Sequence, residues 1–286
     1  MAVQHGEKIM LCSDLDRTLI PNGFQPESPD ARPFLRRLAQ RPELILVYAT
    51  GRDTGLIAEA LKTWDLPLPH IAVGDVGTAI YTVAGTLDKP QFDPWQDWQE
   101  AIAADWNGRN GRDLLKMLSD FKVLRLQAEE KQKAFKLSFY TDVGLDLEGL
   151  AGKMKAALLE NGIRASIVAS IDEMADVGLV DVLPERATKV HAIYYIIQKY
   201  SIDASRVVYA GDSGNDLPAL TSGLNAVLVR NASEDVCRQA IDMASQKGHE
   251  FALYLAEGGF MGMNGNYAAG VLEGLAHFMP AVRHWL

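Results

Sequence analysis

Short apolar runs that alternate with helical segments constrain the fold of this chain more than any other feature. The runs at residues 8–13, 44–50 and 70–74 read as buried strands, and AIYTV follows as a further one. The segments 28–40 and 51–63 between them place apolar residues at helical spacing. Apolar strands separated by helices are typical of a parallel sheet that is covered on both faces. The sequence therefore predicts an α/β fold. We expect Ser28 to cap the first helix.

The same pattern returns in the last third of the chain. Residues 188–200 place apolar side chains at intervals of three and four, which predicts an amphipathic helix. Residues 206–210 and 224–229 read as buried strands, and 234–245 and 267–278 as helices. We therefore expect this part to belong to the same core domain as the first.

The middle of the chain follows another pattern. It begins with a Trp-rich stretch, and alternating polar and apolar residues at 133–142 then predict a strand. We read it as an inserted α+β domain. The expected domains are residues 1–83 and 184–286 for the core and 84–183 for the insert. The expected elements of the insert are helices near 95–106 and 147–161 and strands at 133–142, 164–172 and 178–184.

Composition excludes several classes of function. The chain has 286 residues, 48% of them hydrophobic, and a net charge of −9. An acidic chain of this kind is not expected to bind nucleic acid. Its two cysteines make neither a disulfide framework nor a zinc site. The start does not resemble a signal peptide, and no apolar run is long enough to span a membrane, so we expect a cytoplasmic protein without membrane contact.

The sequence Asp14-Leu15-Asp16-Arg17-Thr18 follows the first predicted strand, at the sheet edge where open α/β sheets bind ligands. Two carboxylates so close together repel each other unless a cation lies between them, and magnesium prefers oxygen ligands. Asp14 could then attack phosphorus and form an acyl phosphate. Asp16 could protonate the leaving alcohol and later deprotonate water.

Three further motifs can bind phosphate or metal. Thr50 and Gly51 stand where the second strand meets its helix, and a helix N-terminus with a hydroxyl beside it suits phosphate. Lys189 opens the helix 188–200 and can reach a phosphate oxygen. The loop at residues 211–216, GDSGND, follows a predicted strand, and its carboxylates and amide can complete a magnesium site.

Each motif alone is also compatible with an ordinary structural role. The alternatives are a solvated acidic turn, a strand-to-helix turn capped by Thr50, a surface lysine, and a polar loop in which Asp216 caps the next helix. Their joint order favours a site, because a parallel sheet brings the carboxyl ends of its strands together.

The segments DLDRT, YATGRD, Lys189 and GDSGND resemble the four motifs of the haloacid dehalogenase superfamily of phosphohydrolases. The segments AVGDVGTAIY, VDVLPERATK, VLVRNAS and NYAAGVLEGLAHF, with the pair Trp98 and Trp106, are similar to its sucrose-phosphate phosphatase branch. This resemblance covers roughly residues 9–81 and 180–278. It implies a Rossmann-like parallel-sheet core with an α+β cap inserted between the second and third motifs.

The resemblance also implies a role for each motif residue. Asp14 is the implied nucleophile and Asp16 the general acid/base. The implied phosphate ligands are Thr50, Gly51 and Lys189, the implied Mg²⁺ ligands are Asp14, the backbone carbonyl of Asp16 and Asp212, and Asn215 and Asp216 support Lys189 and the metal loop. In the insert, we expect Lys136 to contact sugar hydroxyls, the alternative being a strand lysine that points to solvent.

The implied activity is magnesium-dependent hydrolysis of a soluble sugar phosphate through an aspartyl phosphate. Sucrose 6-phosphate is the expected substrate. Family members often carry Ser-Asn-Lys-Gly where this chain has Ala187-Thr188-Lys189-Val190, so a glycosylglycerol or glycosylglycerate phosphate stays open. A hexose phosphomutase of the same fold and a non-catalytic sugar-phosphate binding module are the alternative functions. A sugar-phosphate synthase that supplies the substrate is a candidate partner.

Overall fold

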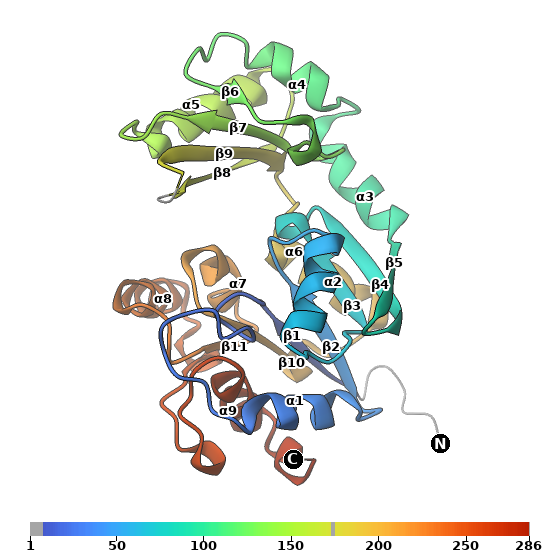
Figure 1. Cartoon of the computed structure of the whole chain (residues 1–286). Coiled ribbons are helices and arrows are strands. Elements are labelled where there is room, and N and C mark those ends of the chain that lie inside the picture. Colours follow the sequence, from blue (N-terminus) through green and yellow to red (C-terminus); the bar gives the residue numbers. More distant parts are fainter. Residues whose placement is uncertain (1–7, 173–174, 286) are drawn as a thin grey trace. The chain divides into compact units, whose positions relative to one another are not determined.

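The computed structural model describes residues 8–172 and 175–285, which belong to two compact units (Figure 1). The core unit comprises Met1–Pro94 and Lys189–Leu286, and the inserted unit comprises Trp95–Thr188. The boundaries therefore lie later than the predicted residues 83 and 183. Strand β5 (Lys89–Pro94) pairs with β4 (Ala79–Thr86) and so extends the core sheet. At the second boundary, the backbone N–H of Arg186 donates to Asp105 inside the inserted unit.

The core unit is built on one sheet. Within the described residues it has eight strands, in the order β12-β11-β10-β1-β2-β3-β4-β5. Neighbours from β12 to β3 are parallel, and β4 and β5 add an antiparallel edge. The remaining strands are β1 (Ile9–Ser13), β2 (Leu44–Ala49), β3 (Ile71–Gly74), β10 (Val207–Gly211), β11 (Asn225–Leu228) and β12 (Leu253–Leu255).

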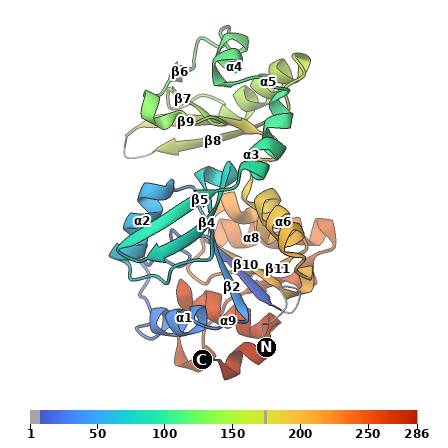
Figure 2. The same cartoon turned by 90° about the vertical axis from the view of Figure 1, so that its right-hand side faces the viewer.

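Helices cover both faces of this sheet, and Figure 2 shows α2 and α6 on opposite sides of it. Ile9 and Leu11 of β1 belong to a buried cluster that includes residues of α1, α2 and α9. Met10 and Cys12 alternate with them along the strand and are buried on the opposite face. Burial on both faces is the reason why β1 consists almost entirely of apolar residues. The helices of the core unit are α1 (Ala31–Ala39), α2 (Thr54–Thr63), α6 (Lys189–Tyr200), α7 (Leu217–Leu220), α8 (Glu234–Lys247) and α9 (Ala268–Phe278).

The predicted cap of the first helix is wrong. Helix α1 begins at Ala31, and Asp30 precedes it without a side-chain capping bond. Ser28 instead accepts a hydrogen bond from the backbone N–H of Asn264 through its hydroxyl. The Ser28 hydroxyl, which we expected to cap the helix, thus binds a segment that lies far along the chain.

The inserted unit has α+β architecture. Its described strands form an antiparallel sheet in the order β6-β7-β9-β8. Helix α4 begins with a reciprocal cap between Asn110 and Asp113, which satisfies free N–H groups of its first turn. The elements are α3 (Gln96–Ala103), α4 (Gly111–Met117), β6 (Arg125–Leu126), β7 (Leu137–Thr141), α5 (Leu147–Glu160), β8 (Ala165–Asp172) and β9 (Val177–Pro184).

The two faces of this smaller sheet differ. Phe139 of β7 and Val180 of β9 lie in a buried cluster with Leu114 of α4 and Met154 of α5. Ser138 points to the other face, where its hydroxyl donates to Asp181. One face is therefore apolar and covered by helices, and the other carries polar groups, as alternation in antiparallel strands requires. These observations confirm the predicted fold class.

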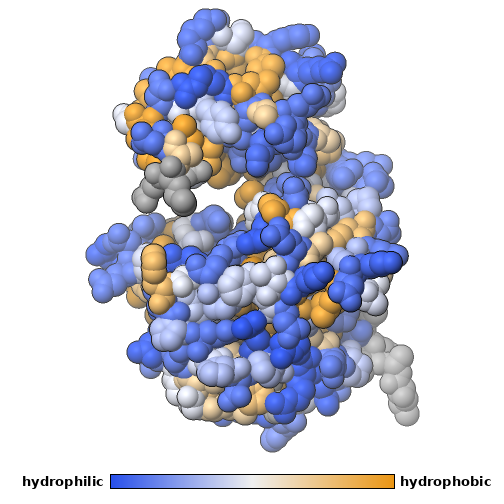
Figure 3. All heavy atoms as spheres, viewed as in Figure 1, coloured by the Kyte–Doolittle hydropathy of each residue, from blue (hydrophilic) through white to orange (hydrophobic). Residues whose placement is uncertain are grey.

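On the face shown in Figure 3, hydrophilic residues predominate, and hydrophobic residues form small scattered groups. None of the helices in the described part of the chain is long and apolar enough to cross a membrane.

Candidate active site

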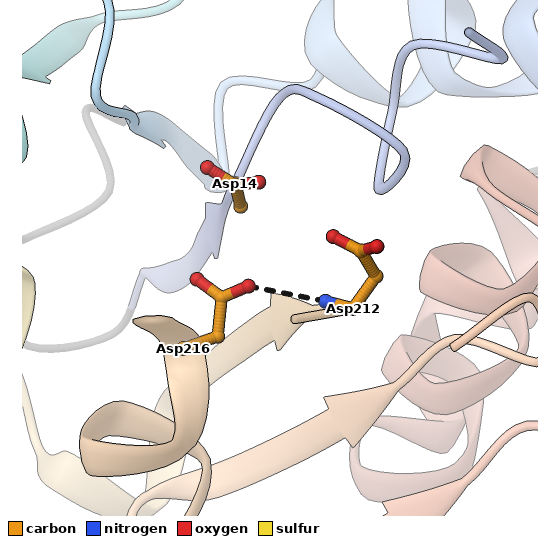
Figure 4. Close-up of side chains that lie close together, drawn as sticks. All are labelled: Asp14, Asp212 and Asp216. Atoms are coloured by element: carbon orange, nitrogen blue, oxygen red, sulfur yellow. Dashed lines mark hydrogen bonds between the residues drawn. The ribbon is translucent and has the colours of Figure 1, made fainter. Parts of the chain in front are cut away.

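Three carboxylates meet beyond the carboxyl ends of neighbouring core strands. Asp14 follows β1, Asp212 follows β10, and Asp216 ends the short 3-10 helix Gly214–Asp216. One ligand atom from each lies within 4.8 Å of the others (Figure 4). Parallel pairing of β1 with β10 brings the two loops side by side, as the sequence predicted.

Lys189 is buried at the centre of this cluster, which excludes the surface-lysine alternative. Its side chain is only 4% exposed. Its Nζ lies 2.7 Å from Asp14 Oδ1, 2.8 Å from Asp216 Oδ1 and 3.2 Å from Asn215 Oδ1. Lys189, the first residue of α6, therefore places its positive charge at the carboxyl ends of β1 and β10.

Asp216 uses its carboxylate to hold this arrangement together. Its Oδ1 accepts bonds from Lys189 and from the hydroxyl of Tyr209, at 2.8 and 2.5 Å. Its Oδ2 accepts from the backbone N–H groups of Asp212 and Ser213 and from the Ser213 hydroxyl. Burial acts to raise the pKa of Asp216, but Lys189 and these bonds hold it below its ordinary value. Since both oxygens are engaged, Asp216 is a structural carboxylate, which leaves Asp14 and Asp212 for a metal.

The cations near Asp14 and Asp212 do not fully offset the burial of these two carboxylates. Burial raises the pKa of Asp14 to about 7 although Lys189 acts against it. Burial, reinforced by Asp216, raises the pKa of Asp212 to about 6 although Arg17 acts against it. Carboxylate oxygens that are buried with too little positive charge are suitable ligands for a hard divalent cation such as magnesium. The residues present therefore fit the metal that the sequence implies.

Asp16 lies apart from the buried cluster and is 40% exposed. Arg52 binds both of its oxygens, with Nε to Oδ2 at 2.8 Å and Nη2 to Oδ1 at 2.6 Å, and Asn22 donates to Oδ1 at 2.8 Å. Burial acts to raise the pKa of Asp16, but the bonds and charge of Arg52 and the bond from Asn22 lower it. Asp16 is therefore an ionised carboxylate here.

Thr50 and Gly51 line the same cavity as the acidic residues. This cavity has a volume of about 280 Å³, and Asp14, Asp16, Arg52 and Asp212 also line it. Thr50 is fully buried, and its hydroxyl accepts from the Arg52 N–H. Helix α2 is capped by Asp53 instead of Thr50, so the capping alternative for Thr50 is wrong.

Sequence reasoning missed several residues of the site. Arg17 and Arg52 stand inside the quoted motifs, yet no role was assigned to them. Each faces a carboxylate of the site, Asp212 and Asp16 respectively. A basic residue beside an acidic motif is a signal that could have indicated this. Asn22 carries no such signal, because only the turn after β1 brings it back to Asp16.

Lys136 lies in the inserted unit, and it does not simply point to solvent. Its side chain is 18% exposed, and its Nζ lies 3.1 Å from Asp181 Oδ2. It also lines a cavity of about 640 Å³ within this unit. Other polar residues lining this cavity are Asn110, Arg112, Gln127, Glu129, Gln132 and Lys133. Lys136 is thus beside a concave surface that polar and apolar residues line together, and its contact with a sugar stays a prediction.

Known proteins with similar sequences and structures include a hydrolase and several phosphatases. A "Putative HAD-like hydrolase" of Nitrosococcus oceani is 52% identical over 98% of this chain and 74% of its own length. The mannosylfructose-phosphate phosphatase of Agrobacterium fabrum is 26% identical over 94% of this chain and 96% of its own length. The chain spans only 60% of the length of a probable sucrose-phosphatase of Arabidopsis thaliana.

The solved structure of the Synechocystis sucrose-phosphatase, in complex with sucrose and phosphate, matches with a TM-score of 0.72. It is 26% identical, and the match covers 95% of this chain and 98% of that one. The family model described as sucrose-6F-phosphate phosphohydrolase matches residues 7–279. The chain therefore belongs to the sucrose-6F-phosphate phosphohydrolase family, within the haloacid dehalogenase superfamily of phosphatases.

Proposed function

We propose that the protein is a magnesium-dependent phosphatase that converts sucrose 6-phosphate to sucrose and inorganic phosphate. The observation that carries this proposal is the buried Lys189, bound to Asp14 and Asp216 at the carboxyl edge of the core sheet. A buried cation beside a carboxylate that lacks further positive charge suits an anionic group approaching Asp14. The family match supports the sugar phosphate as the substrate class.

The first chemical step is attack by an Asp14 carboxylate oxygen on phosphorus. The bond from phosphorus to the sugar oxygen breaks, and that oxygen takes a proton from Asp16. Lys189, Thr50 and Gly51 hold the phosphoryl oxygens. Bound magnesium, held by Asp14, Asp212 and the Asp16 carbonyl, would supply charge neutralisation for the attacked phosphate.

The second step is hydrolysis of the aspartyl phosphate. Asp16 takes a proton from water, the water oxygen binds phosphorus, and the bond from phosphorus to Asp14 breaks. The contacts with Arg52 favour the ionised Asp16 that this step needs. To donate a proton in the first step, Asp16 must first be released from Arg52.

The direct test measures phosphate release from sucrose 6-phosphate and a panel of other sugar phosphates with magnesium present. Asp14→Asn should abolish release while the protein stays folded, and Asp235→Asn, a surface carboxylate on α8, is the matched control. Substantial turnover by Asp14→Asn would refute the covalent mechanism. Sugar products should equal released phosphate in number; transfer of phosphate between sugar positions with little release would indicate a mutase.

Mannosylfructose phosphate is the second candidate substrate. The Agrobacterium relative that is named for it matches nearly its whole length. We also propose that Lys136 contributes to the choice of sugar. Lys136→Ala should raise KM for the preferred sugar phosphate and leave hydrolysis of p-nitrophenyl phosphate unchanged. A glycosylglycerol or glycosylglycerate substrate, a synthase partner and a cytoplasmic location stay predictions.

A further inference from the structure

Arg17 directly follows Asp16, the proposed general acid/base, and its side chain contacts Asp212, a proposed metal ligand. Its Nε lies 3.2 Å from Asp212 Oδ2, and Thr18 donates to the other oxygen, Oδ1, at 3.2 Å. Within the described residues, Nε has no aligned hydrogen-bond acceptor, so its contact with Asp212 is a contact between charges. Asp212 is 4% exposed, whereas Arg17 is 42% exposed. The guanidinium therefore partly neutralises a buried carboxylate from the solvent side.

The backbone of Arg17 is held in place by two asparagines. Its N–H donates to Asn22 Oδ1 at 2.8 Å, and its carbonyl accepts from Asn231 Nδ2 at 2.6 Å. Asn231 is 2% exposed, and its own Oδ1 accepts from the Tyr267 N–H at 2.7 Å. Arg17 has a φ of 58°, a conformation that few residues other than Gly and Asn adopt readily. These contacts hold the Arg17 backbone in place and so set the position from which its side chain extends toward Asp212.

The balance of charges around Asp14, Asp212 and Asp216 indicates the role of Arg17. Among the residues that the structure describes, the cations in direct ion pairs with Asp14, Asp212 and Asp216 are Lys189 and Arg17. With Lys189 committed to Asp14 and Asp216, Arg17 is the cation that opposes the charge of Asp212. A divalent cation at Asp212 must share that carboxylate with the guanidinium and is repelled by it.

We propose that Arg17 is a fixed cation that competes with magnesium for Asp212 and thereby sets the affinity of the site for divalent cations. This inference rests on the proposed function, because it assumes that magnesium binds at Asp14 and Asp212. Arg17 acts through Asp212 and is a positioning residue of the metal site. Since the contact is partly exposed, its removal should strengthen magnesium binding only modestly, by about five-fold.

The test is calorimetric titration of magnesium chloride into the EDTA-treated full chain, at constant ionic strength and without substrate. Arg17→Asn removes the charge and suits a φ of 58°. Arg17→Gly is a second neutral variant with the same backbone tolerance. Arg17→Lys keeps the charge. Arg41→Asn is the matched control, since Arg41 is 41% exposed and lies 3.4 Å from Glu43.

Both neutral variants should bind magnesium about five-fold more tightly than the wild-type protein, while Arg17→Lys and Arg41→Asn stay within two-fold of it. Circular dichroism checks that each variant is folded, and a folded Arg17→Gly keeps the test valid if Arg17→Asn does not fold. Unchanged or weaker binding by the neutral variants, with normal binding by the wild type, would overturn the role of Arg17 alone. Absence of magnesium uptake by the wild type and by both neutral variants would overturn both this inference and the proposed function.

Discussion

Asp14→Asn should stabilise the metal-free protein above pH 7 although it removes the proposed nucleophile. The wild-type cluster holds Asp14, Asp212 and Asp216 against Lys189 and Arg17, and burial disfavours the unbalanced negative charge. The substitution removes one carboxylate and keeps the shape of the side chain. Lys189 then retains Asp216 as its partner, so the buried pair stays neutral.

The size of the effect follows from the pKa of Asp14. Its ordinary value is 3.8, and burial raises it to about 7 in the folded protein. Protonated Asp14 therefore favours the folded state below about pH 4, and this contribution is lost as pH rises to about 7. Each pH unit between the two values is worth about 1.4 kcal/mol, which sets an upper limit of ~4 kcal/mol at pH 8.

Urea denaturation of both proteins in EDTA, at intervals from pH 5 to pH 8, measures this effect. The free energy of unfolding of Asp14→Asn should exceed that of the wild type by a margin that grows up to about pH 7 and then stays constant. Added magnesium should stabilise the wild type more and reduce the margin. A margin that does not change with pH, or a variant that is less stable at pH 8, would refute the argument.

Two further substitutions test the packing around the site. Asp216→Asn should destabilise the protein by about 3–5 kcal/mol, because both Asp216 oxygens accept hydrogen bonds from protein donors and the amide nitrogen of Asn cannot accept them. Asp235→Asn on the surface should change stability by less than about 0.5 kcal/mol. Similar urea midpoints for the two variants would contradict this. Gly274→Ala should cost about 1–3 kcal/mol, because its Cβ would lie 2.2 Å from Val227, while Gly152→Ala, with open space around it in α5, should be neutral or stabilising. Thermal unfolding compares this pair, and equal shifts would show that Gly274 is not closely packed.

The edge of the core unit shows why element boundaries were harder to predict than the fold. The residues of β5, KPQFDP, include two prolines and lack β-branched residues, so the segment has little local preference for a strand. The strand forms because β4 offers it a pairing edge, an interaction that local sequence does not encode. The inserted unit therefore starts later than the predicted residue 84. Ser28 was misassigned for the same reason, since its partner Asn264 comes from a distant segment.

The sequence by itself determined the fold and the proposed catalytic residues. Buried parallel strands need apolar side chains on both faces, so their runs are visible, and each run leads directly to a polar motif. Because parallel strands end at one edge, Asp14, Thr50 and Asp212 could be placed together before any coordinates were known.

Only the tertiary structure decided how the charges of the site are paired. Whether Asp216 binds metal or Lys189 depends on which atoms surround it, and all of its acceptor positions are taken by protein donors. The hydrogen bond that Asn231 donates to the Arg17 carbonyl joins residues that lie 214 positions apart. Side-chain electrostatics depend on distances in space and on burial, and neither follows from spacing along the chain.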